Sequence, residues 1–147
     1  MEPVRIKNFS FTVRLFFSLI LTLIGVNYLF LLTGIWLDTQ MDLSKIEEGY
    51  STFETVELLE HSFRYLFWFI GAFGLSIGLF LMSAHSQRLK TIFVMGVPVL
   101  IISDIGSMWL VRFSPWFALQ LFLSGFLLAA SFLILFVLLQ RELLFKR

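Results

Sequence analysis

Cysteine is absent from this 147-residue sequence, and several common catalytic motifs are absent with it. Without thiols the chain cannot form disulfides, carry out thiol redox chemistry or bind zinc or iron–sulfur clusters through sulfur. The sequence also contains no GxSxG, no HExxH, no P-loop and no glycine-rich dinucleotide motif. Only two histidines are present, so few candidates remain for a hydrolytic or metal-dependent active site.

Charged residues are also scarce. They make up 14% of the chain and leave a net charge of +1, so no global field favours nucleic acid as a partner. Hydrophobic residues, in contrast, make up 59%, and the mean hydropathy is +0.90. A soluble domain contains about 45–50% apolar residues. One buried core cannot hold this excess, so we expect a lipid bilayer to surround the chain.

Four segments are long and apolar enough to cross a membrane, because about 20 residues span about 30 Å of hydrocarbon. They cover residues 12–37, 63–84, 91–111 and 115–139. All must be helices, since an open strand would leave backbone groups unpaired in lipid. The sequence therefore predicts an all-α membrane protein. It is an antiparallel four-helix transmembrane bundle in one domain, residues 1–147, with an acidic outer loop at residues 38–62.

The first span follows a basic patch and so resembles a signal peptide at first sight. The apolar run from Leu15 to Leu37 is too long for the core of one, and no small-x-small cleavage pattern follows it. We therefore expect this span to be retained.

Basic residues predict the orientation of the spans. Eight of the eleven Lys and Arg lie before the first span or in its first residues, between the second and third, or after the fourth. Both termini are therefore expected in the cytoplasm. The four tryptophans fall near the opposite, outer ends of their spans, where an amphipathic ring suits the membrane interface. These predicted interface anchors are Trp36, Trp68, Trp109 and Trp116.

The outer loop is the only sizeable segment outside the predicted spans. Seven acidic residues and one base, Lys45, lie between residues 38 and 60. The spacing of Ser51 and Glu54 is typical of a capping box, so the second span is expected to begin outside the membrane as one long helix. Ser114-Pro115 predicts a tight turn, which would make the third and fourth spans an antiparallel hairpin.

Asp104 is the most informative single residue, because it lies inside the third span. A carboxylate in hydrocarbon normally faces the bundle and finds a partner. Arg64, near the outer end of the second span, is the expected counter-ion. One interpretation is structural, as an Asp–Arg pair or a protonated Asp hydrogen-bonded across helices. The other is functional, as a proton or ion relay or a ligand site.

His61 and Glu57 are four residues apart and would share one helix face. They could supply two ligands to a metal, but a site needs three or four, with Asp104 or loop acids as the remainder. The alternative is a solvated ladder of ion pairs. His85 lies 24 residues after His61, about 36 Å along a helix, so the two cannot bind one haem within a monomer.

Small residues interrupt the second and fourth spans. Gly71, Gly74 and Gly78 follow one another in the second, and Gly125 lies in the fourth. Small residues let helix backbones approach closely in lipid. These glycines could pack within the bundle or against another subunit. Asn27, in the middle of the first span, is expected to hydrogen-bond to a neighbour.

A longer pattern adds a resemblance. It comprises His61-Ser-Phe63, Lys90, Pro98, Ser103-Asp104, Ser107-Met-Trp109, Arg112-Phe-Ser-Pro115, Phe117-Ala118 and Ser124-Gly125. Over roughly residues 57–142 the chain resembles a family of small bacterial inner-membrane proteins with four helices and no established activity. The resemblance implies this fold, the inner membrane and a shared role for Asp104. That family often has His-x-His where this chain has Phe63, which puts an implied haem or metal role in doubt.

Three classes of function remain open. The first is a non-catalytic accessory or assembly subunit of a larger membrane complex, with a respiratory complex as one candidate, bound to other membrane subunits or to itself. The second is a protein that binds haem, a metal or a quinone, or handles protons or ions, near the outer leaflet. The third is a lipid-modifying enzyme. No cofactor is predicted, and haem or a metal would belong to the second class.

Overall fold

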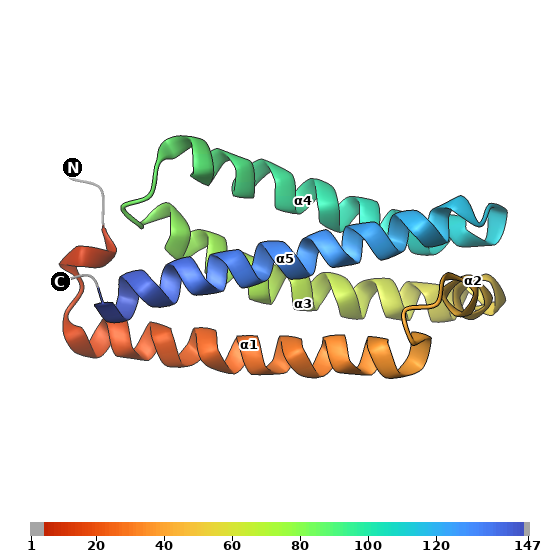
Figure 1. The fold of residues 1–147 in the computed structure, drawn as a ribbon, viewed down its shortest axis with the longest axis horizontal. Coiled ribbons are helices and arrows are strands. Elements are labelled where there is room, and N and C mark those ends of the chain that lie inside the picture. Colours follow the sequence, from red (N-terminus) through yellow and green to blue (C-terminus); the bar gives the residue numbers. More distant parts are fainter. Residues whose placement is uncertain (1–4, 146–147) are drawn as a thin grey trace.

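The computed structural model describes residues 5–145, with only the backbone of residue 7, and the regular elements of this part of the chain are all helices (Figure 1). Five α-helices and two short 3-10 helices follow one another along it. They are η1 (Ile6–Asn8), α1 (Phe11–Thr39), α2 (Leu43–Thr52), α3 (Thr55–Leu81), α4 (Gln87–Leu110), η2 (Val111–Phe113) and α5 (Trp116–Phe145).

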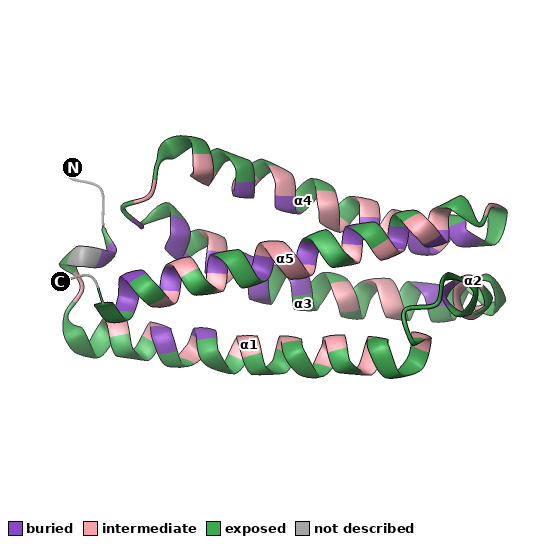
Figure 2. Ribbon diagram, viewed as in Figure 1, coloured by how far each residue is buried: buried purple, intermediate pink, exposed green. Residues whose placement is uncertain are grey.

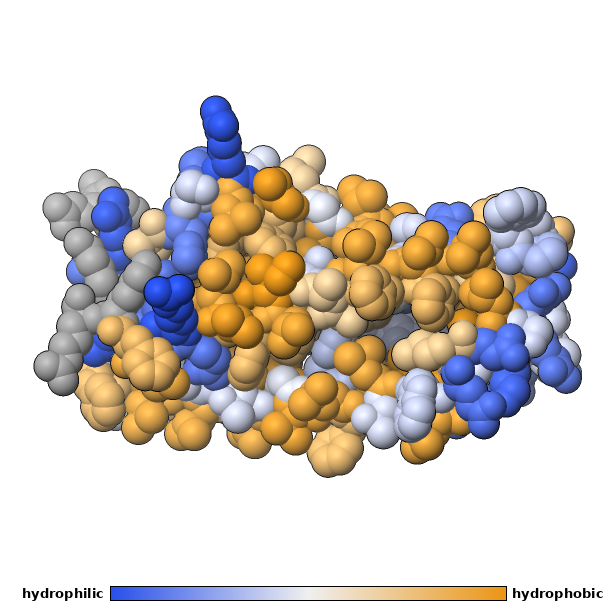
Figure 3. Space-filling model, viewed as in Figure 1, coloured by the Kyte–Doolittle hydropathy of each residue, from blue (hydrophilic) through white to orange (hydrophobic). Residues whose placement is uncertain are grey.

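Four of these helices are long and apolar enough to span a membrane, which confirms the predicted fold class. They are α1, α3, α4 with η2, and α5. Helix α1 and the α4–η2 segment extend beyond the predicted spans at both ends, α3 begins eight residues before its predicted span and ends three residues short of it, and α5 extends six residues beyond its predicted end. Side chains that face away from the bundle are largely hydrophobic, and Figure 3 shows a broad apolar band between two more hydrophilic ends. The band matches what lipid contact requires.

The first and last described residues lie at one end of the bundle, and α2 lies at the other (Figure 1). We call these the terminal end and the α2 end. The helices α4 and α5 form the most extensive contact, as the Ser114-Pro115 turn predicts for a hairpin. Helix α3 packs on both of them. Helix α1 packs mainly on α5, and among the described helices it has little contact with α3.

The outer loop differs from the prediction in its first half. Residues 43–52 form α2, with the Asp42 carboxylate accepting a 2.9 Å bond from the Ser44 amide as its N-cap. The predicted capping box at Ser51 and Glu54 is wrong. The box begins at Glu54, whose backbone N–H donates 2.9 Å to the Glu57 carboxylate. The long helix expected for the second span does form, as α3.

Side-chain hydrogen bonds hold the terminal end together. Glu142, 3% exposed, accepts a 2.8 Å bond from the Ala84 backbone, and its other carboxylate oxygen lies 3.6 Å from His85 Nε2. The Gln140 amide exchanges bonds with Ser18 and donates to Thr22, which ties α5 to α1. Figure 2 shows the buried residues along the facing sides of the helices.

Candidate functional site

Asp104 lies on α4 and faces the interior of the bundle, with only 6% of its surface exposed. The Ser124 hydroxyl on α5 donates a 2.8 Å hydrogen bond to Asp104 Oδ1. Gly125 packs beside it, since a Cβ there would lie 3.6 Å from the same oxygen. The sequence therefore places a small residue where the two helices meet around the carboxyl group.

The expected Arg64–Asp104 pair is wrong. The Arg64 guanidinium bonds Glu60 at 2.8 Å, one turn away on α3, and its side chain is 58% exposed. At the membrane depth of Arg64, a long side chain reaches the polar surface more easily than the bundle interior. Among the described residues Asp104 forms no salt bridge. The hydrogen bond that its carboxyl group accepts from the described residues comes from the Ser124 hydroxyl.

Three tyrosines lie near enough to Asp104 for an electrostatic interaction, and the sequence alone did not indicate them. The chain has three tyrosines. Tyr28 on α1, Tyr50 on α2 and Tyr65 on α3 all lie within electrostatic range of the Asp104 carboxyl group, and the Tyr50 and Tyr65 hydroxyls interact with each other. Burial raises the pKa of Tyr50, which lies outside the spans, well above its usual range. The Tyr50 phenol therefore stays neutral at physiological pH.

His61 and Glu57 do not form the start of a metal site. His61 Nδ1 lies 3.0 Å from the backbone oxygen of Glu57, and the imidazole packs between the rings of Phe53 and Tyr65. The Glu57 carboxylate is occupied by the capping box of α3. Within residues 5–145, no group of three or more His, Asp or Glu side chains is placed to hold a metal ion.

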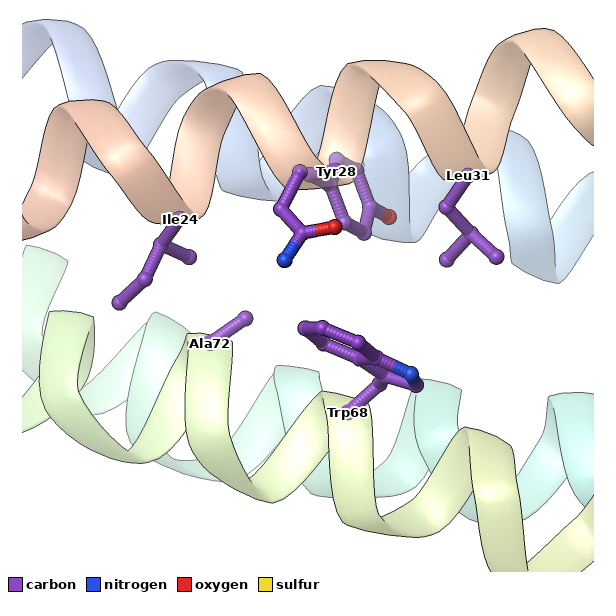
Figure 4. Close-up of a pocket in the computed structure, with 6 residues that line it drawn as sticks. Ile24, Tyr28, Leu31, Trp68 and Ala72 are labelled. Carbon is purple, nitrogen blue, oxygen red and sulfur yellow. The ribbon is translucent and has the colours of Figure 1, made fainter.

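A cavity of about 150 Å³ opens between α1 and α3. Figure 4 shows Tyr28 and Leu31 facing Trp68 and Ala72 across it, with α5 and α4 behind. Tyr28 also packs its ring against Phe132 of α5, with 4.7 Å between the ring centres. The lining residues are Ile24, Asn27, Tyr28, Leu31, Trp68 and Ala72.

Asn27 lines this cavity and does not make the hydrogen bond that the sequence predicted. No described residue bonds its side-chain amide, whereas Gln140 on α5 uses both its amide atoms to tie the helices together. An amide at this depth is costly without a partner. The unpaired amide therefore belongs to an exposed residue of α1 that also lines the cavity.

The four glycines that were expected to pack against a helix divide into two groups. Gly125 packs within the bundle, as one of the two interpretations expected. Gly71, Gly74 and Gly78 are exposed on α3, and a Cβ at each would meet no atom within 4 Å. Their spacings of three and four residues place them on one helix face. Packing within the bundle does not explain these three glycines.

Trp36, Trp109 and Trp116 lie toward the α2 end, and Trp68 lies at the middle of α3. Trp36 and Trp116 are exposed near the ends of their helices, and Trp68 is partly exposed further along α3. Trp109 donates a 2.8 Å bond to the Ser62 hydroxyl and lies under Arg112. Their role as interface anchors stays a prediction.

A family model described as a transmembrane helical domain matches residues 48–147. The matched segment begins inside α2 and includes α3, α4 and α5, which carry Asp104, Ser124 and the exposed glycines. The family is uncharacterised and assigns no activity. No curated protein and no solved structure matches the chain.

Proposed function

The chain belongs to the family of transmembrane helical domains, and we propose that it serves as a small accessory or assembly subunit of a larger membrane complex. The observation that carries this proposal is the exposed face of α3 that contains Gly71, Gly74 and Gly78. We call these residues the glycine face.

Glycine destabilises the helix at these positions. Inside a helix it costs about 1 kcal/mol relative to alanine, and nothing in the bundle would obstruct an alanine methyl group there. The isolated bundle therefore gains nothing from the three glycines. Small residues are useful where a second helix must approach the backbone closely in lipid. Phe67 and Ile70, exposed beside the glycine face, would supply apolar contact to such a helix.

The proposed location is the bacterial inner membrane, with both termini in the cytoplasm. Arg5, Arg88 and Arg141 are exposed at the terminal end, where the excess of basic residues supports a cytoplasmic position. Lys146 and Arg147, which contribute to the same excess, lie outside the described residues. The exposed tryptophans near the α2 end support an outer interface there.

Leucine substitutions on the glycine face test the proposal. Gly74→Leu and Gly78→Leu should abolish the stable complex with other membrane subunits, because the added side chains prevent close helix approach. The matched controls are Gly34→Leu on α1 and Gly106→Leu on α4, where a Cβ also meets nothing within 4 Å. Native mass spectrometry of the tagged protein, extracted from its own membranes in mild detergent, measures the complex.

Alanine at the same positions separates association from folding. Gly74→Ala should leave the isolated bundle equally stable or more stable, by up to about 1 kcal/mol. Loss of the complex then cannot be due to misfolding. A wild-type protein that always emerges alone, or complexes that survive leucine on the glycine face, would contradict the subunit role.

A further inference from the structure

We propose that a groove between α4 and α5 binds an uncharged lipid that carries a hydroxyl group. The groove has a volume of about 250 Å³. Its polar lining residues are Ser103 of α4 and Gln120 and Ser124 of α5, and the remaining lining consists of four leucines and Trp116. The proposal is independent of the subunit role, because the glycine face lies on α3.

One wall of the groove connects directly to the buried carboxyl group of Asp104. Ser124 lines the groove although only 3% of its surface is exposed. Its Oγ lies 2.8 Å from Asp104 Oδ1 and 3.0 Å from the Leu121 backbone oxygen, so its single proton is already used. The hydroxyl oxygen can still accept a bond. A ligand O–H that donates to Ser124 would therefore extend the chain to Asp104, and bonds in such a chain strengthen one another.

Gln120 gives the groove hydrogen-bonding groups that the chain itself leaves unused. Its amide nitrogen donates a 3.0 Å bond to the Ser103 hydroxyl, across the two helices. Its carbonyl oxygen and its second N–H have no partner among the described residues, and the residue is exposed. A side-chain amide that faces lipid without partners is costly. The groove therefore favours an occupant that both donates and accepts hydrogen bonds.

The chemistry of the lining selects the polar group of the ligand. No Lys, Arg, Asp or Glu among the described residues lines the groove, so neither a phosphate nor an ammonium group would find a counter-charge there. An ammonium group also only donates, and a bare hydrocarbon would leave Gln120 without a partner. A hydroxyl group is uncharged and both donates and accepts. It therefore matches the N–H and the oxygen atoms that the groove presents.

The size and direction of the groove define the rest of the ligand. Its volume of about 250 Å³ exceeds the roughly 150 Å³ that holds benzene, so it admits an alcohol group with its first methylene groups. Trp116 is the first residue of α5, and Leu127 lies about 16 Å further along the helix. The groove thus runs from the α2 end toward the middle of the membrane, between leucine side chains that suit a hydrocarbon tail.

A binding measurement on the isolated chain tests the site. Tritiated dodecanol is the probe, with the protein in phosphatidylcholine nanodiscs and scintillation proximity as the readout; empty nanodiscs correct for partition into lipid. Wild-type protein should bind dodecanol saturably. Dodecyl methyl ether cannot donate a hydrogen bond and dodecyl phosphate is charged, so both should displace the probe about tenfold less well than unlabelled dodecanol does.

Two variants test the residues of the groove. Gln120→Leu removes the amide and should raise Kd about tenfold, and Ser124→Ala should also raise it. Asn27→Leu is the matched control, because Asn27 is likewise an exposed amide of a spanning helix but lies outside this groove; its Kd should stay at the wild-type value. Circular dichroism and thermal unfolding establish that each variant is folded. If Ser124→Ala, which deprives Asp104 of its hydroxyl partner, fails to fold, Gln120→Leu decides the question.

The proposal is overturned by non-saturable binding to wild type, by equal displacement with the ether or the phosphate, or by an unchanged Kd in folded Gln120→Leu. Wild-type protein that binds no dodecanol, together with a Gln120→Leu variant that loses its native complex, would assign the groove to a protein partner instead. The leucine substitutions on the glycine face test the subunit role separately.

Discussion

The two ends of this bundle are held together by different means. At the terminal end, Glu142 and Gln140 of α5 reach the α3–α4 connection and α1 through directed hydrogen bonds. Toward the α2 end, α1 contacts α5 through the rings of Tyr28 and Phe132, and a cavity separates α1 from α3. Asp104, Asn27 and the tyrosines belong to this second region. The terminal end therefore ties α1 to α5 by hydrogen bonds, whereas the other region ties them by ring packing beside a cavity. One buried oxygen of the terminal end, Glu142 Oε2, has no hydrogen-bond partner among the described residues.

This difference suggests a division between stability and function. Proteins usually break the rules of packing and polar satisfaction at functional sites and compensate elsewhere. At the terminal end, the bonds of Glu142 to Ala84 and of Gln140 to Ser18 and Thr22 join segments that are distant in sequence. Three predictions test the comparison, beginning with the largest expected effect.

Glu142→Ala should destabilise the bundle by about 3 kcal/mol, since it removes a buried acceptor and leaves the Ala84 N–H without its partner. Reversible unfolding in mixed micelles measures the effect. Glu142→Gln is the control, because its side-chain oxygen can still accept from Ala84, and it should lose about 1 kcal/mol or less. Equal losses in both variants would show that the Ala84 bond contributes little.

Gly25→Leu should destabilise the bundle by about 1–2 kcal/mol through overpacking. A Cβ at Gly25 would lie 3.1 Å from Cε2 of the Phe136 ring, where α1 approaches α5 closely. Gly34→Leu, further toward the α2 end on the same helix, meets no atom with its Cβ and should be neutral or stabilising. Thermal unfolding in detergent compares the two. Similar losses would mean that α1 is held equally tightly along its length.

The smallest effect is expected at Asp42, the N-cap of α2. Hydrogen bonds from Ser44 hold the pKa of the Asp42 carboxyl group below its usual value of 3.8. A pKa that is lower in the folded chain means that the carboxylate stabilises α2 above pH 3.8 and that this contribution is lost as the pH falls below it. Protection of the Ser44 amide from hydrogen exchange should therefore decrease in acid.

Asp42→Ser provides the control for this titration, because serine caps a helix without ionising. Its protection factor at Ser44 should be unchanged by acid, once intrinsic exchange rates are corrected. A loss of protection in both chains would place the acid-sensitive group elsewhere.

The spans and their hairpin could be predicted from the sequence because they depend on long apolar runs and on one Ser-Pro turn. Helix α2 was missed, although signals for it were present. Asp42 stands before Leu43 as an N-cap residue, and Ile46 and Tyr50 are four residues apart, as on one face of a helix. The capping box was displaced because Ser51 and Glu54 have the right spacing but lie across the break between α2 and α3.

The rotation of each helix about its axis could not be predicted. Helices α1, α4 and α5 are apolar on all sides, so no polar face shows which residues point inward. Asp104 could be placed inside by the cost of charge in lipid, but its neighbours could not. Arg64 was predicted as its partner only because the two residues lie at a similar depth in the membrane. The three tyrosines come from three different helices.

The packing of α1 on α5 has a consequence for synthesis. Synthesis proceeds from the N-terminus, so α1 reaches the membrane before α5. The principal contacts of α1 are with α5, and it has little contact with the helices made between them. The hydrogen bonds of Ser18 and Thr22 to Gln140 cannot form until α5 has been translated. Helix α1 therefore enters the lipid without its main partner and packs only after α5 has been made.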